Sequence, residues 1–187
     1  MCFGHLWNTD IDVIYVKSAK NTMCSGISKK RKTLSELAEV FGPMGFFSPV
    51  IVSGKIFLQD LWERNLKCDD EICGYDKLKW ISISAELRKI SEVSIPRFIG
   101  LEANQNNVTY KLLCFCDASK RAYSTAINLH QSSGNATKCE LIFSKSRLAP
   151  IKGMTIPKLE LMAVLIGVRS QKFVKTELTL VIDKTFL

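Results

Sequence analysis

Long hydrophobic segments are missing from this sequence. Its longest uninterrupted apolar run is Leu161–Val168, whereas a helix that spans a bilayer needs about 20 apolar residues. A secretory signal is missing too, because residues 1–12 mix polar and apolar side chains and lack the ordered basic, apolar and small-residue regions. We therefore expect an intracellular protein, of the cytoplasm or nucleus, with no membrane partner.

The sequence also offers little with which to bind zinc. It contains only two histidines, and its seven cysteines form no Cys-x-x-Cys pair. Structural zinc sites take four Cys or His ligands, usually with such paired spacing, so a zinc site is not expected. An odd number of cysteines in an intracellular protein instead indicates buried, reduced thiols.

The sequence has enough apolar residues to form a folded core, and its charge is unevenly distributed along the chain. Hydrophobic residues make up 47% and charged residues 24%, which is typical of globular proteins. Residues 1–109 contain 14 Lys/Arg against 13 Asp/Glu, whereas residues 110–187 contain 12 against 5, a balance of +7. This asymmetry favours a polyanionic partner, nucleic acid before a membrane surface. An ordinary solvated basic surface explains the charge alone equally well.

Helical patterns dominate the first hundred residues. Apolar residues recur at helical spacing over residues 34–41, and Gly42–Pro43 ends that segment. A second helix is predicted over Ser48–Trp62, because a capping residue followed by proline is typical of a helix start. A third amphipathic helix is indicated by Trp80, Ile83, Leu87 and Ile90. The polar residues 102–107 are the predicted boundary.

Strands and one helix are predicted beyond that boundary. Residues 110–116 form an almost continuous apolar run, typical of a central strand covered on both faces. Residues 122–130 alternate apolar and polar side chains and return through residues 139–144 as a hairpin. Pro157 opens an apolar helix to about Phe173, and Glu177–Ile182 resembles a second buried strand. A crossover through one helix makes the first and last strands parallel, which gives an α/β fold, or α+β with the helical part included.

Carboxylates stand at three informative positions in this second part. Asp117 and Asp183 each follow a predicted parallel strand, so both are expected at the carboxyl edge of the sheet, where open α/β sheets bind ligands. Glu160 lies in the first turn of the connecting helix with apolar or small residues at i+3, i+4 and i+7, and is expected to face the sheet. Converging carboxylates need a cation, and hard oxygen ligands select Mg²⁺ or Mn²⁺. Such a set suits metal-assisted phosphodiester cleavage.

A simpler explanation of the same three residues stays open. Asp117 can cap a turn, Glu160 can interact with the helix dipole, and Asp183 can terminate a strand. Residue types and spacing alone do not separate these structural roles from metal binding.

Three sequence blocks in the second part are more specific than any single residue. They are Cys114–Tyr123 (CFCDASKRAY), Ser144–Pro150 (SKSRLAP) and Thr155–Ala163 (TIPKLELMA). Together they resemble the ribonuclease H-like part of BEL/Pao retrotransposon polyproteins, and residues 3–8, 30–36 and 41–49 look like the same family's reverse transcriptase palm end and thumb. The resemblance implies a helical palm-end, thumb and connection-like region over 1–105 and a truncated ribonuclease H-like domain over 106–187, an incomplete mixed sheet with a crossover helix.

The resemblance also implies a chemistry. Asp117, Glu160 and Asp183 would be the first three members of the metal-binding carboxylate set of ribonuclease H, whose substrate is RNA paired to DNA. The fourth member lies farther along in the family, and Lys184 stands where the family usually has serine. We therefore expect a fragment of a Pol polyprotein, by descent a metal-dependent hybrid ribonuclease and inactive alone. The alternative is a non-enzymatic nucleic-acid-binding or structural relic.

Basic residues are the candidate nucleic-acid contacts. The cluster Lys29–Lys32 (Lys29, Lys30, Arg31, Lys32) precedes a helix, where positive charge opposes the macrodipole, and in a thumb-like region it would grip a phosphate backbone. A solvated charge run or a localisation signal explains this cluster equally well. In and between the family blocks the candidates are Lys145, Arg147, Lys152 and Lys158.

Two other activities of such polyproteins lack their motifs. Polymerisation needs a Tyr-x-Asp-Asp hairpin, and the only adjacent aspartates, Asp69 and Asp70, lie in an acidic stretch typical of a solvated turn. No Asp-Thr-Gly or Asp-Ser-Gly triplet exists for an aspartic protease. Neither polymerase nor protease activity is expected.

Overall fold

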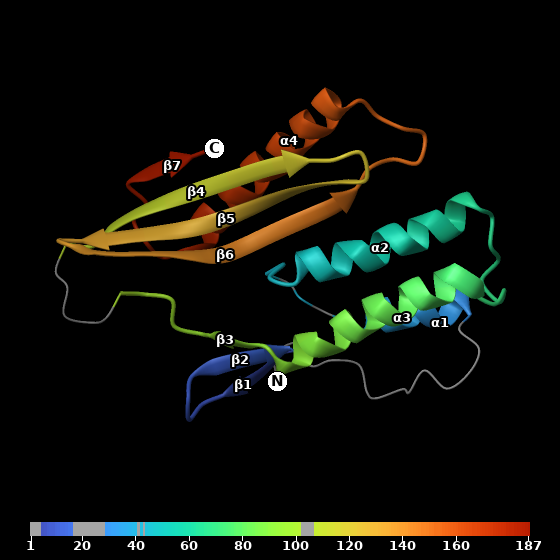
Figure 1. Cartoon of the computed structure of the whole chain (residues 1–187). Coiled ribbons are helices and arrows are strands. Elements are labelled where there is room, and N and C mark those ends of the chain that lie inside the picture. Colours follow the sequence, from blue (N-terminus) through green and yellow to red (C-terminus); the bar gives the residue numbers. More distant parts are fainter. Residues whose placement is uncertain (1–4, 17–28, 41, 43, 102–106) are drawn as a thin grey trace. The chain divides into compact units, whose positions relative to one another are not determined.

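A computed structural model describes residues 5–16, 29–40, 42, 44–101 and 107–187 (Figure 1). The chain divides into two compact units, the first made of residues up to 43 and 47–97, the second of residues 44–46 and 98–187. The predicted boundary falls mostly on residues 102–106, which lie outside the described ranges. The division into a reverse transcriptase-derived region, 1–105, and a ribonuclease H-like domain, 106–187, stays a prediction.

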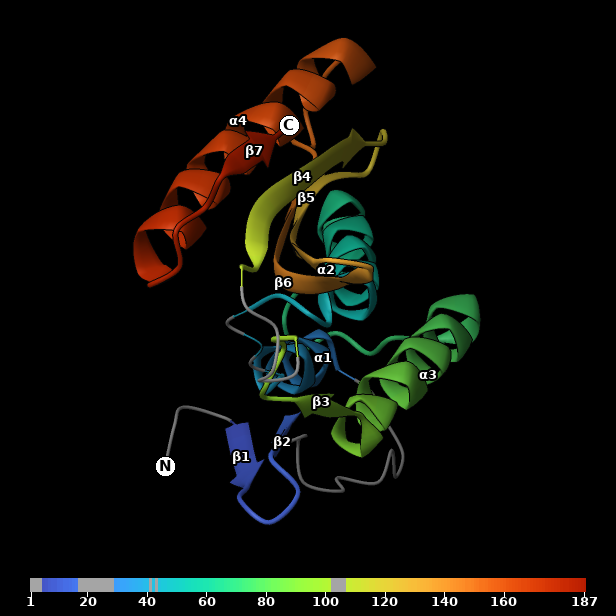
Figure 2. The same ribbon diagram turned by 90° about the vertical axis from the view of Figure 1, so that its left-hand side faces the viewer.

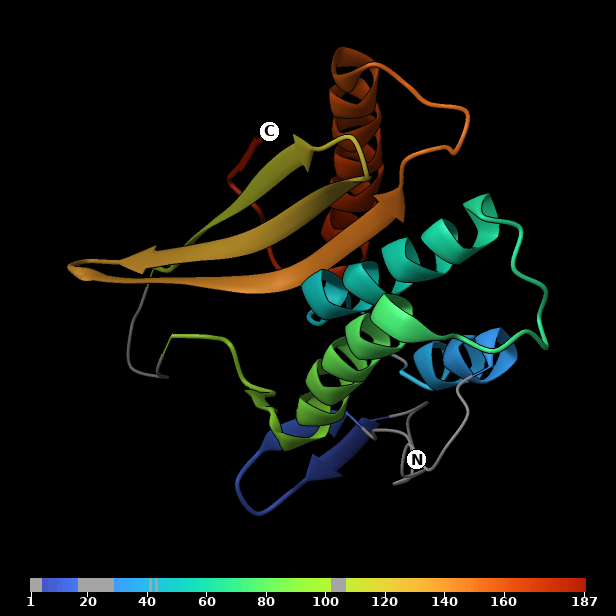
Figure 3. The same cartoon turned by 45° about the vertical axis from the view of Figure 1, so that its right-hand side comes forward.

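The first unit combines a small antiparallel sheet with three helices (Figure 3). Its strands pair in the order β1-β2-β3, a sheet that the sequence patterns did not predict. The three predicted helices are confirmed. The elements are β1 (His5–Asn8), β2 (Val13–Val16), α1 (Lys30–Ala38), α2 (Ser48–Glu63), α3 (Gly74–Lys89), a 3₁₀ turn (Ile90–Glu92) and β3 (Ser94–Pro96).

The helices of this unit bury an apolar core between them. All four apolar positions predicted for the third helix are buried in α3 and the turn that follows it, and the Trp80 ring stacks on Phe57 of α2 with centroids 5.6 Å apart. The predicted apolar face of α1 is only partly right. Leu37 is buried but Leu34 is 48% exposed, and Phe41 lies outside the described residues.

Lys30 of α1 is buried in this core, although the sequence predicted only apolar residues there. Its side chain is 2% exposed, its Nζ donates a hydrogen bond to the backbone carbonyl of Leu66, and the ammonium lies 3.7 Å from the centroid of the Trp62 ring. The carbonyl and the face of the indole both stabilise the charge, while the aliphatic stem packs like an apolar side chain. Lys30 therefore holds α1 against the end of α2 and the loop after it.

The second unit is a four-stranded sheet crossed by one long helix (Figure 1). The strands run in the order β6-β5-β4-β7, with β4 antiparallel to β5 and parallel to β7. This confirms the predicted strand, hairpin and crossover helix and the parallel direction of the last strand, although that strand lies at other residues than predicted. The elements are β4 (Thr109–Ala118), β5 (Ala122–Ser133), β6 (Ala136–Leu148), α4 (Ile156–Glu177) and β7 (Lys184–Phe186).

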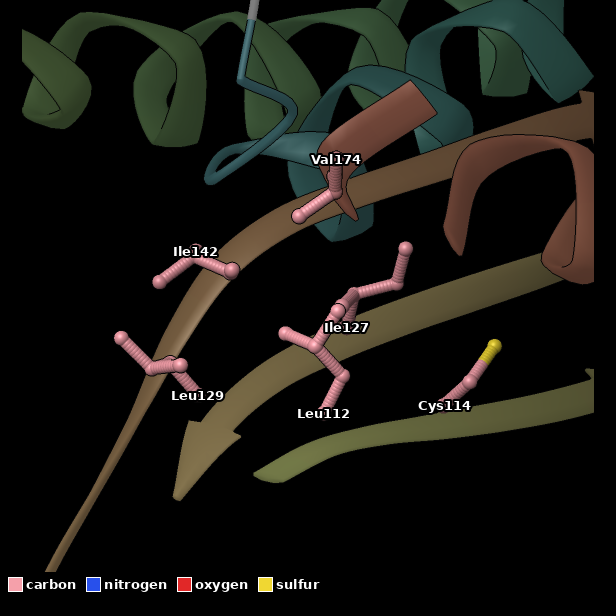
Figure 4. Close-up of a cluster of buried hydrophobic side chains, with 6 residues drawn as sticks. All are labelled: Leu112, Cys114, Ile127, Leu129, Ile142 and Val174. Atoms are coloured by element: carbon pink, nitrogen blue, oxygen red, sulfur yellow. The ribbon is translucent and has the colours of Figure 1, made fainter. Parts of the chain in front are cut away.

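Helix α4 covers one face of this sheet (Figure 2). Alternate residues of β5, among them Tyr123, Thr125, Ile127 and Leu129, are buried as the alternation predicted. Figure 4 shows the central cluster, which consists of Leu112, Cys114, Ile127, Leu129, Ile142 and Val174. The prediction that the first strand is covered on both faces is wrong, because Phe115, which alternates with Cys114 and Cys116, is 60% exposed.

The last strand differs from its prediction. Helix α4 continues to Glu177 because Ser170 and Val174 extend its buried face and no glycine or proline stops it earlier. Leu178, Leu180 and Ile182 pack against the sheet core without forming a strand, and pairing begins only at Lys184. A short apolar run does not distinguish a strand from a helix end and linker, which explains the error.

No helix in the described parts of the chain is both long and apolar enough to cross a membrane. The longest uninterrupted apolar run, Leu161–Val168, lies in α4, and one face of this helix packs on the sheet.

Helix α4 lies very close to β4 at Gly167. A Cβ atom at this position would lie 2.5 Å from Cys116 Sγ, 3.1 Å from Cys114 Sγ and 3.2 Å from Thr125 Oγ1. Any larger side chain would push the helix away from the strands. Glycine is required here for close packing.

We predict that Gly167→Val lowers the free energy of unfolding by about 1–3 kcal/mol through overpacking. The control is Arg169→Val, which places the same side chain on an exposed position of the same helix and should change stability by no more than about 0.5 kcal/mol. Chemical denaturation followed by circular dichroism measures both. Equal stabilities for the two variants would contradict the close approach of α4 to β4.

We also predict that Lys30→Met lowers the free energy of unfolding by about 1–3 kcal/mol, because the partly buried Leu66 carbonyl loses its donor while the apolar volume is kept. Lys29→Met is the control, since Lys29 is exposed. Tryptophan fluorescence during urea unfolding reports on this unit through Trp62 and Trp80. If both variants unfold at the same urea concentration, Lys30 has no structural role.

Candidate nucleic-acid and metal site

Asp117 lies near the carboxyl end of β4, where it pairs with Ser124 of β5. Its neighbours Cys116 and Ala118 pack against the apolar cluster beneath α4. Successive side chains of a strand point to opposite faces, so Asp117 extends from the face that α4 does not cover. It is exposed to solvent there.

Glu160 lies in the first turn of α4, as predicted, but it is exposed and does not pack on the sheet. The contact face of the helix runs through Leu159, Ala163 and Ile166, which are buried with Tyr123 and Ala149. Glu160 stands about 100° around the helix from Leu159, at the margin of that face. It shares with Asp117 the end of the unit at which α4 begins, because the Leu159 cluster includes Cys116 and Ala118.

Asp183 lies at the opposite end of β4. Its backbone amide donates to the carbonyl of Tyr110 at 2.9 Å, and its carboxylate accepts a hydrogen bond from the Tyr110 amide at 2.8 Å. Tyr110 precedes Asp117 by seven residues of strand, which at about 3.3 Å per residue is about 23 Å. Asp183 therefore precedes its strand instead of closing it, and the structure does not bring it to Asp117.

The three carboxylates consequently do not form one metal site in this arrangement. No group of three or more His, Cys, Asp or Glu side chains that could hold a metal occurs within the described ranges. The parallel register sets Lys111–Leu113 beside Lys184–Phe186, so β7 pairs with the end of β4 that lies away from Asp117. Asp183 does not fit a Mg²⁺ or Mn²⁺ site shared with Asp117, and its carboxylate instead satisfies a strand-end amide.

The cysteines are less uniformly buried than expected. Among those described, Cys68, Cys73 and Cys139 are exposed, and all five are free thiols. Cys114 is buried beneath α4, and this burial raises the pKa of its thiol to about 11, so it stays protonated at neutral pH. Cys2 and Cys24 lie outside the described residues.

The basic cluster before α1 is largely occupied by contacts within the protein. Lys30 is buried, so it is neither a phosphate contact nor part of a solvated run. Arg31 forms two 3.0 Å hydrogen bonds with the Asp69 carboxylate, and this pairing holds the pKa of Asp69 below its usual value. Lys29 and Lys32 are the two cations of this cluster that are neither buried nor paired with a carboxylate in the described structure.

The four candidate cations of the second unit are all exposed. Lys145 and Arg147 lie two residues apart on β6, so they share one side of the strand. Lys152 lies in the turn that follows and Lys158 in the first turn of α4. Within the part of the chain that the structure describes, none of these four forms an ion pair.

Three further exposed cations on α4 were not predicted as nucleic-acid contacts from the sequence. They are Arg169, Lys172 and Lys175, spaced at intervals of three. Residues three apart on a helix lie on neighbouring turns, and this spacing was the signal that could have identified them.

Comparison with known families accounts for most of this chain. No protein with a curated description is similar enough to be matched. Residues 29–187, however, match the family model described as the Pao retrotransposon-like RNaseH-like domain. The match includes the four-stranded sheet of the second unit, helix α4 that covers it, and helices α1, α2 and α3 of the first unit. The chain therefore belongs to the Pao retrotransposon-like RNaseH-like family and is a ribonuclease H-like fragment of a Pao/BEL retrotransposon polyprotein.

Proposed function

We propose that this fragment binds nucleic acid, with the RNA/DNA hybrid as its substrate class, as part of a polyprotein that is by descent a metal-dependent ribonuclease. The observation that carries the proposal is the family match over residues 29–187, on a sheet whose parallel strands are joined by one crossover helix. Ligands of open α/β sheets bind at the carboxyl ends of the strands, and Asp117 lies at that end of β4.

The charge of the second part supports binding to phosphates. Residues 110–187 carry a balance of +7, and Lys145, Arg147, Lys152 and Lys158 are exposed. Cations of this kind neutralise phosphates and release counterions, which gives affinity without reading base sequence. The proposed interaction is therefore electrostatic and independent of sequence.

The proposed cation is Mg²⁺ or Mn²⁺, bound weakly by these 187 residues. Asp117 and Glu160 remain the proposed ligands because they lie at the same end of the unit. Asp183 is left out because its carboxylate is bonded to the amide of Tyr110. A site with so few convergent oxygens would not organise paired cations, so the fragment alone is proposed to be inactive.

A second candidate is a nucleic-acid-binding or structural relic without turnover. The observation that favours it is the separation of Asp183 from Asp117 along β4. Both candidates share the binding step and differ in whether hybrid RNA is cut when the fragment is part of a longer chain.

We predict that a fluorescently labelled RNA/DNA hybrid binds the fragment and that log affinity falls linearly with log salt concentration. The double variant Lys145→Glu/Arg147→Glu should weaken binding at low salt by about tenfold or more, because two phosphate contacts become repulsive. Lys77→Glu, an exposed lysine of α3, is the control and should bind nearly as well as the original protein. Fluorescence anisotropy gives each affinity. Binding that is independent of salt would refute the electrostatic account.

For the metal, we predict weak Mn²⁺ binding that Asp117→Asn reduces and Asp183→Asn leaves unchanged. The reason is that only Asp117 lies at the end of the unit where α4 begins. Paramagnetic broadening of backbone amide signals shows where Mn²⁺ binds, and gel assays of labelled hybrid should show no cleavage by the fragment. Broadening centred on Tyr110 and Asp183 would place the site at the wrong end of β4.

A further inference from the structure

The outward face of α4 carries an apolar stripe that nothing in the described structure covers. Leu161 is 68% exposed, and three further aliphatic side chains on the same side are also exposed. The four residues follow the i, i+3, i+4, i+7 spacing of one helix face, and they are Leu161, Val164, Leu165 and Val168. This stripe lies opposite the buried contact face of Leu159, Ala163 and Ser170.

Positive charge continues and borders this stripe. Lys172 follows Val168 by four residues and so prolongs the line of the stripe by one turn. Lys158, Arg169 and Lys175 are exposed on its borders and along its continuation, whereas Glu160 lies to one side of it and Glu177 lies on the opposite side of the helix, in line with Leu159. The outward face is thus apolar over its first turns and basic over its last.

A second copy of the chain does not suit this face. Two α4 helices packed antiparallel about Leu165 would set Lys158 near the partner's Lys172, and a parallel pair would set each lysine near its own counterpart. Like charges at helix–helix contacts are destabilising.

A lipid surface or a nucleic acid suits it less well than a helix does. An interfacial helix keeps its apolar face along its whole length and its charges at the sides, whereas Lys172 here stands in the line of the apolar residues. Phosphates would meet the lysines and leave Leu161 and Val168 in water. A partner helix satisfies both halves of the face, since helices pack side-chain ridges into grooves over two to three turns.

We propose that the outward face of α4 docks an amphipathic helix of a protein partner. The partner's apolar residues cover Leu161, Val164, Leu165 and Val168, and its Asp or Glu side chains lie against Lys172 and Lys175. Docked helices of this kind are anchored by residues at i, i+3, i+4 and i+7. This interaction is separate from nucleic-acid binding and does not depend on the function proposed above.

The test uses the full 187-residue chain and a designed helical peptide, 18 residues long, with a leucine stripe over its first half and glutamates over its second. Fluorescence anisotropy of the labelled peptide should show saturable binding, and Leu161→Glu/Val168→Glu should weaken it at least tenfold. Leu78→Glu is the matched control, because Leu78 of α3 is 67% exposed, and it should leave peptide affinity unchanged. Leu161→Glu/Val168→Glu should retain hybrid binding to the same extent as Leu78→Glu, which adds acidic charge elsewhere, and this comparison separates the proposal from the previous one.

Charge reversal gives the second arm of the test. Lys172→Glu/Lys175→Glu should no longer bind the peptide with glutamates. It should instead bind a second peptide that has the same leucine stripe but lysines in place of the glutamates. Equal binding of both peptides by the original protein would overturn the proposal. So would self-association, binding to vesicles of anionic phospholipid, or hybrid binding that is lost with Leu161→Glu/Val168→Glu, since each would identify a different occupant.

Discussion

The contact between α4 and β4 at Gly167 is the constraint on which the second unit depends. Because Gly167 has no side chain, the helix packs directly on Cys114, Cys116 and Thr125. This short distance between helix and sheet allows the two apolar clusters to form beneath α4. The same close contact sets the direction in which α4 crosses the sheet, so that the segment after α4 lies beside β4. The parallel pairing of β7 and the burial of the Cys114 thiol both follow from it.

The placement of charged groups follows from the same geometry. With one face of the sheet under α4, alternation sends Asp117 to the other face, and the helical repeat leaves Glu160 at the margin of the contact. The linker after α4 returns along the sheet core and delivers Asp183 to Tyr110 at the start of β4. The packing of α4 on the sheet thus determines where each carboxylate lies. Whether two of them can bind the same metal ion depends on whether they lie at the same end of the sheet.

Periodic signals in the sequence predicted the fold well where burial is one-sided and the element is long. The alternation in β5 and the proline-led start of α4 each follow from local chemistry, and both proved right. Residue spacing did not predict contacts between distant segments. Lys30 looked like part of a solvated charge run because Trp62 and the Leu66 carbonyl, which stabilise it, lie more than thirty residues away. The same limit explains the error at Asp183, whose position depends on where α4 ends.

The short strand β7 also bears on the order in which the second unit assembles. Three residue pairs join β7 to β4 across a separation of 73 residues, whereas the β5–β6 hairpin is built from neighbours in sequence. Closing so long a loop for so few hydrogen bonds is entropically costly, and local pairs form faster than non-local ones. The hairpin and α4 are therefore expected to form first and β7 to dock last. Amide hydrogens of β7 should accordingly exchange with solvent through local opening, well before those of β5.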